Sequence, residues 1–142
     1  MKKKLIVTSM VMLLVVGCVG LSVNQKVLVD TTLESAAFLL GNLGAKKNPV
    51  AFHAAALVAK RAMEHPLWDL AFTEKTLNEM WVEVMPYLSG DPAMLHLAKK
   101  WLTIVEYDDT IGHITVPPEY GDLIRNGISE FTLGVQMAGL GV

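Results

Sequence analysis

Residues 73–92 read TEKTLNEMWVEVMPYLSGDP, a spacing that predicts one amphipathic helix followed at once by another. Their large apolar side chains recur at steps of three, four, seven and eleven, so they share one side of a helix: Leu77, Met80, Trp81, Val84 and Leu88. Thr73 is the predicted N-cap. Ser89-Gly90-Asp91-Pro92 then supplies a glycine beyond the helix end, an aspartate cap and a proline at the next first turn.

Similar capping and proline signals predict two helices in the segment before residue 73. The Thr-x-x-Glu spacing of residues 31–34 is that of a capping box and predicts a helix that starts at Thr31. Asn48-Pro49 predicts the start of an alanine-rich helix that runs to about Glu64. We expect these two helices to pack as an antiparallel hairpin, with Gly41 and Gly44 as packing residues.

The segment after residue 92 is also predicted to be mainly helical. One helix is expected from Pro92 to about Tyr107, and Pro117-Pro118 opens a last one. A loop from Asp108 to Val116 holds the one predicted strand, Ile111 to Val116, which is short and β-branched. The sequence therefore predicts an all-α fold, with about five helices in a compact bundle after an N-terminal signal or anchor helix.

The N-terminal residues have the composition of an export signal. Met1-Lys2-Lys3-Lys4 is followed by the apolar run Leu5–Val16 and by Gly17-Cys18. The ending Val15-Val16-Gly17-Cys18 resembles the lipobox of bacterial lipoproteins. That resemblance implies that Cys18 is diacylated and becomes the first residue of the mature protein. The domains expected from it are a signal peptide (1–17), a lipid-proximal tether (18–29) and a helical domain (30–142).

Two other interpretations of this segment remain open. Leu5–Val23 is a nineteen-residue run without charge, which at about 1.5 Å per residue comes close to spanning a bilayer as an uncleaved anchor. Ordinary signal-peptidase cleavage is the other. Each places the residues after about 24 on the periplasmic side. In the enterobacterial sorting scheme, Val19 in place of Asp favours the outer membrane.

Charge and cysteine content narrow the classes of partner. All 14 acidic residues follow Cys18, whereas three of the 12 basic residues precede it, so the mature chain has a formal charge of 9 − 14 = −5. This acidic balance argues against nucleic acid, whose binding depends on basic side chains that neutralise phosphates. The single cysteine, Cys18, excludes an internal disulfide.

The most specific candidate for chemistry is an acidic segment with a nearby imidazole. Glu106, Asp108, Asp109 and His113 carry ligand types that bind divalent cations, although their spacing matches no known metal-loop pattern. The alternative is an acidic loop at a helix end. Met-x-His occurs twice, at residues 63–65 and 94–96, which suggests a copper site only if both pairs meet.

No residue is predicted to be catalytic, because the serines lack a nucleophile-elbow context and no cofactor fingerprint occurs. We therefore expect a non-enzymatic lipoprotein without a cofactor, held to membrane lipid through Cys18 and bound to an unknown envelope protein. Trp68, in a turn beside Pro66, is the candidate for partner binding. In size, anchor and helix content the chain resembles small uncharacterised lipoproteins of bacteria and phages. A metal-binding protein and a membrane-active helical protein are the alternatives.

Overall fold

The computed structural model describes residues 22–139, with side chains from residue 32 onward. The chain divides into two units at Thr31. Of the first unit the structure describes residues 22–31, which begin helix α2 (Ser22–Lys47). The second unit starts at Thr32 and contains every other element. The predicted signal peptide and Cys18 lie outside the described residues.

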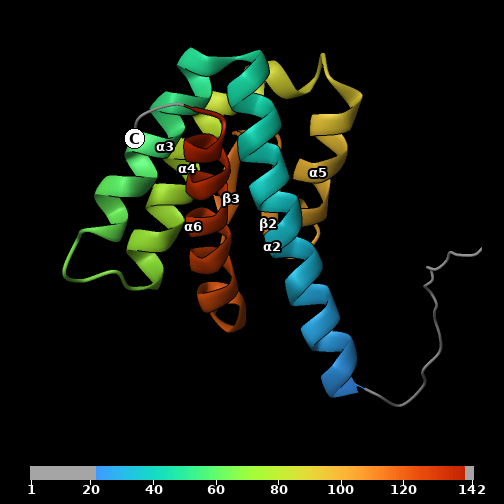
Figure 1. Ribbon diagram of the computed structural model, residues 1–142. Coiled ribbons are helices and arrows are strands. Elements are labelled where there is room, and N and C mark those ends of the chain that lie inside the picture. The colour runs from blue at the N-terminus through green and yellow to red at the C-terminus, as the bar shows by residue number, and fades with distance from the viewer. Residues whose placement is uncertain (1–21, 140–142) are drawn as a thin grey trace, which may run out of the picture. The chain divides into compact units, whose positions relative to one another are not determined.

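The described part of the chain confirms the predicted all-α class (Figure 1). After α2 come four further α-helices, which are α3 (Pro49–Met63), α4 (Leu70–Leu88), α5 (Pro92–Leu102) and α6 (Gly121–Met137). Between α5 and α6 the short strands β2 (Glu106–Asp108) and β3 (His113–Thr115) pair antiparallel, and the 3-10 helix η1 (Pro118–Tyr120) follows. Gly112, with φ of 66°, supplies the left-handed residue of the hairpin turn.

Helix α6 lies against each of the other four helices in the second unit. A Cβ at Gly134 would lie 2.1 Å from the carbonyl oxygen of Phe38, and one at Gly41 would lie 2.2 Å from that of Phe131. Only glycine allows the backbones of α2 and α6 to approach this closely. A Cβ at Gly44 would meet the ring of Phe52 in α3 at 2.0 Å. Both glycines are therefore packing residues, but only Gly44 packs within the predicted hairpin, because Gly41 packs against α6.

The core is built on the alanine-rich face of α3. Ala55, Ala56 and Ala59 are fully buried, and their small side chains let α3 approach its neighbours closely. Phe52 of α3 stacks on Phe131 of α6, with ring centroids 5.8 Å apart. Aromatic and branched side chains of α4, α5 and α6 fill the remaining space.

Three helix starts differ from the predictions. The last helix, predicted to open at Pro117-Pro118, begins as the 3-10 helix η1, and α6 itself starts at Gly121. Helix α2 begins at Ser22 rather than Thr31, because no glycine or proline interrupts residues 21–40 and a threonine is tolerated inside a helix. Helix α4 is capped by Asp69, whose carboxylate accepts a hydrogen bond from Phe72 N at 2.8 Å. The predicted cap, Thr73, lies inside the first turn and donates its hydroxyl to Asp69 O at 2.7 Å.

The end of α5 also differs. The helix stops at Leu102 rather than near Tyr107, where the β-branched run Thr103-Ile104-Val105 lowers helix propensity. Residues 106–108 form β2, so the prediction that a loop begins at Asp108 is wrong. The predicted strand at residues 111–116 is confirmed in its centre as β3. β2 forms because it pairs with β3, and the residue pattern of residues 106–108 alone does not reveal that partner.

Candidate binding surface and cavity

Two side chains of α4 hold the β2–β3 hairpin. Asn78 donates from Nδ2 to the carbonyl oxygen of Ile114 at 2.8 Å, and its Oδ1 accepts from Ile114 N at 2.8 Å. Glu74 Oε1 accepts from Val116 N at 2.8 Å. An amide and a carboxylate thereby pair with the free edge of β3 as a strand would. The role of neither residue was predicted from the sequence. The one signal in the sequence is the amide of Asn78 inside an amphipathic helix.

This attachment decides which side chains of the hairpin face solvent. Ile114 is 1% exposed, and Tyr107 packs edge-on against Trp81 with ring centroids 5.7 Å apart. Because side chains alternate along a strand, Glu106, Asp108 and His113 point outward and are exposed. Asp109 is exposed in the turn that follows β2. We call Glu106, Asp108, Asp109 and His113 the hairpin face.

The residues of the hairpin face do not come together as the metal site considered as an alternative. Asp108 pairs with His113 in the strand register, but Glu106 lies opposite Thr115. Asp108 Oδ1 accepts from Thr110 N at 3.0 Å, and His113 Nε2 lies 3.7 Å from Glu74 Oε2. Among residues 32–139, no three His, Cys, Asp or Glu side chains come close enough to share a metal ion. The four predicted ligands therefore share a face without forming a ligand set.

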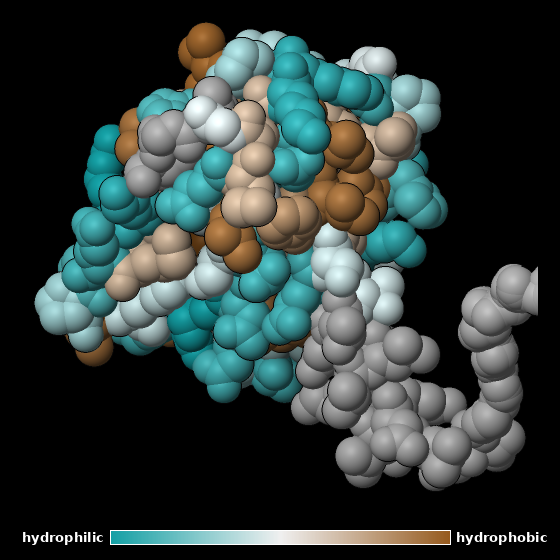
Figure 2. Space-filling model, viewed as in Figure 1, coloured by the Kyte–Doolittle hydropathy of each residue, from teal (hydrophilic) through white to brown (hydrophobic). Residues whose placement is uncertain are grey.

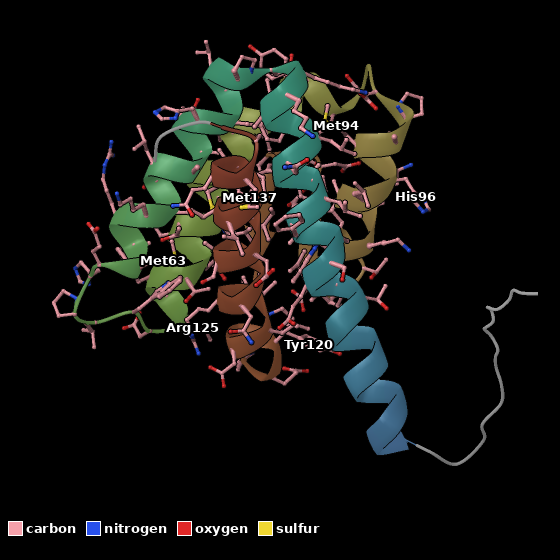
Figure 3. The ribbon with its side chains drawn as sticks, viewed as in Figure 1. Met63, Met94, His96, Tyr120, Arg125 and Met137 are labelled. Carbon is pink, nitrogen blue, oxygen red and sulfur yellow. The ribbon has the colours of Figure 1, made fainter. Side chains whose placement is uncertain are left out.

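The two Met-x-His pairs lie in different parts of the second unit. Met63 is on one side in Figure 3 and accepts a hydrogen bond from Ser129 Oγ at 3.3 Å, whereas Met94 is fully buried at the start of α5. His96 points to solvent on the far side of α5 (Figure 3). His65 Nδ1 is engaged by the backbone of Leu67. The structure does not bring the two pairs together.

Trp68, the candidate for partner binding, is only partly exposed. Its side chain is half-buried against the core, and its indole nitrogen is inaccessible to solvent. Leu67 N donates a hydrogen bond to His65 Nδ1 at 3.1 Å and closes the turn. Leu67, 65% exposed, takes the outer position, and Trp68 packs inward. A partner-binding role for Trp68 stays a prediction that no contact tests.

An apolar cavity lies at the centre of the second unit, between α2, α4, α5, α6 and β3. It has a volume of about 90 Å³ and is partly open at its rim, and the residues that line it are apolar. The largest hydrophobic patch visible in Figure 2 lies where α2 and α5 approach one another, and both helices contribute cavity walls.

Two tryptophans of the cavity wall carry unpaired donors. Trp81 of α4 and Trp101 of α5 line the cavity, and the indole Nε1 of each is buried with no acceptor among the described residues. A buried donor without a partner costs about 1–3 kcal/mol. Trp101 is positioned by Gly127 of α6, where a Cβ would lie 2.3 Å from its ring. The sequence places Trp81 on the apolar stripe of its helix, but nothing in it indicates that Trp81 and Trp101 line a common cavity.

None of the described helices combines the length and the apolarity that a membrane span requires. No family model matches the chain, and neither a curated protein nor a solved structure matches it.

Proposed function

We propose that this chain is an exported bacterial lipoprotein that binds a protein partner at the cell envelope and does not act as an enzyme. The proposal of an anchor rests on the basic start, the apolar run and Val15-Val16-Gly17-Cys18. Diacylation of Cys18 would hold the helical domain at the membrane, facing the periplasm, with Val19 favouring the outer membrane. Membrane lipid and one envelope protein are the proposed partners.

The observation that carries the proposed partner binding is the uncompensated charge of the hairpin face. Glu106, Asp108 and Asp109 are exposed, and none forms an ion pair within residues 32–139. Two carboxylates elsewhere have cationic neighbours: Glu79 pairs with Lys75, and Asp122 pairs with Arg125. A basic surface on a partner would neutralise this cluster and orient the encounter.

The hairpin face is also rigid and has an apolar tip. The side chains of Asn78 and Glu74 make three hydrogen bonds with the backbone of Ile114 and Val116 and so fix β3 to α4. Little conformational entropy is therefore lost when a partner binds. Ile111, in the turn, is 71% exposed and offers an apolar anchor beside the carboxylates. A basic rim around a small apolar pocket is therefore the partner chemistry that fits best.

Affinity capture of the full-length protein from a mild-detergent membrane extract tests the proposal. We expect a protein to be captured whose recovery falls at least tenfold with the triple variant Glu106→Gln, Asp108→Asn, Asp109→Asn. The charge-matched control is Glu64→Gln, Glu119→Gln and Glu130→Gln, which lie outside the hairpin, and it should leave recovery unchanged. Equal recovery with the two triple variants would show that the hairpin face is not the binding surface.

A further inference from the structure

We propose that the central cavity binds the end of one unbranched alkyl chain, as in a fatty acid, while the polar head of that molecule stays outside the rim. The residues that line the cavity belong to the second unit, and none of them is part of the hairpin face. This binding therefore does not depend on a protein partner.

The wall of the cavity selects hydrocarbon. The side chains that line it are apolar, and the indole nitrogens of Trp81 and Trp101 are buried out of its reach. A water molecule held inside a protein makes about three hydrogen bonds, and this wall offers almost no polar atom to make them. The part of a ligand that enters the cavity must therefore carry no polar group.

The size and the opening of the cavity select the end of a chain. An apolar cavity of about 150 Å³ holds the six carbons of benzene, so at the same packing the volume of about 90 Å³ found here holds about four carbons. An aromatic ring is too large, whereas the last carbons of a flexible chain fit. Leu102 and Val105 line the cavity but are only partly buried, so the remainder of the chain can leave at the rim.

Apolar surface continues outside the cavity. The walls include Leu40 of α2 and Ala98 of α5, and the hydrophobic patch in Figure 2 lies where these two helices approach one another. Leu39, the neighbour of Leu40 in α2, is 46% exposed. Each methylene group that the protein removes from water strengthens binding about fourfold. Contact with apolar side chains alone can therefore hold one alkyl chain without any polar contact.

Bromine attached to a chosen carbon of the chain provides the test, because it quenches the fluorescence of an indole that it contacts. The full-length protein is kept in micelles of a steroid detergent, whose rigid rings are too large for the cavity. 12-Bromododecanoic acid carries its bromine at the end of the chain, and 2-bromododecanoic acid carries it beside the carboxyl group. We expect the first acid to quench at least about threefold more strongly than the second, since only the chain end reaches Trp81 and Trp101.

Tryptophan variants identify the indoles that are quenched. Trp68 does not line the cavity. Trp68→Phe, which keeps both cavity indoles, should therefore retain the difference between the two acids. The double variant Trp81→Phe, Trp101→Phe retains Trp68 as its one tryptophan and should lose that difference.

A cavity-filling variant locates the bound chain. Ala98, 2% exposed, lines the cavity, and Ala98→Leu should fill it and lower quenching by 12-bromododecanoic acid to the level of the 2-bromo acid. Ala98→Val is the smaller replacement if leucine unfolds the protein. Ala93→Leu, which adds the same side chain at an exposed position of α5, is the matched control and should leave quenching unchanged. Equal quenching by the two acids in the wild type, or undiminished quenching in a folded Ala98→Leu, would overturn the proposal.

Discussion

Asn78 and Ile114 are joined by two hydrogen bonds of 2.8 Å each, one donated by the Asn78 side chain and one accepted by it. The pair fixes the orientation of the amide, because Nδ2 must face the carbonyl and Oδ1 the N–H. A residue in a helix thus completes the pairing of a strand 36 positions later in the chain. The orientation of the whole hairpin face follows from this contact.

We expect Asn78→Leu to destabilise the protein by about 2–4 kcal/mol, since both backbone groups of the buried Ile114 lose their partners. Urea unfolding followed by circular dichroism measures the change. Asn126→Leu, on the exposed side of α6, is the matched control and should change stability by less than about 0.5 kcal/mol. Equal losses in the two variants would contradict the proposed role of Asn78.

Gly134→Ala should be among the most destabilising single substitutions, at about 3 kcal/mol or more. The added Cβ would lie 2.1 Å from the carbonyl oxygen of Phe38, a backbone atom that cannot move without shifting α2. Gly90→Ala serves as the control, because a Cβ there has no heavy atom within 4 Å among the described residues. Thermal unfolding of both variants decides the prediction, and similar melting temperatures would refute the close α2–α6 crossing.

The stability of the protein should fall at acidic pH partly through Asp91. The hydrogen bond from Lys47 Nζ, 2.5 Å from Asp91 Oδ2, and a second bond from Met94 N lower the pKa of Asp91 below its ordinary value of 3.8. A carboxyl with a depressed folded-state pKa contributes stability above its unfolded-state pKa and loses it as pH falls through the folded-state value.

Asp91→Asn keeps a capping side chain but removes this charge. Its stability deficit relative to wild type should therefore be full at pH 7 and disappear at a pH below the folded-state pKa of Asp91. Lys47→Met should show the same pH dependence, because it removes the other half of the pair. Urea midpoints measured at several pH values provide the comparison, and a deficit that is independent of pH would contradict it.

Cys18→Ser should abolish lipidation and leave a full-length precursor in the membrane. The lipobox-like run ends at Cys18, whose sulfur would carry the lipid as a thioether. Serine has no sulfur and cannot form that bond. Metabolic labelling with an alkyne fatty acid compares the two forms. Equal labelling of wild type and variant would favour the uncleaved anchor, Leu5–Val23.

Calorimetric titration of the protein with zinc, copper or calcium should detect no binding at micromolar affinity. The reason is geometric, since the hairpin face brings Asp108 opposite His113 but leaves Glu106 opposite Thr115. Tight binding that disappears with Asp108→Asn, Asp109→Asn and His113→Ala would instead establish a metal site at the hairpin face.

Local chemistry in the sequence determined most helix boundaries. Asn48-Pro49 and Asp91-Pro92 each begin a helix in the structure as predicted, and α4 ends at Leu88 just before Ser89-Gly90. Capping and proline effects act within one turn, so the residues that cause them are adjacent in the chain. The buried stripe of α4 and the packing role of Gly41 and Gly44 were also predictable from spacing and residue size.

Contacts between segments that are distant in the sequence decided the β2–β3 hairpin and the central cavity. Strand β2 exists because Glu106–Asp108 finds β3 as a partner, and β3 in turn is held by Asn78. The central cavity arises because Trp81 and Trp101 come from helices whose facing sides meet only in the folded bundle. Hydrogen bonds and dispersion contacts depend on distances of a few ångströms between residues far apart in sequence, and tertiary packing alone sets those distances.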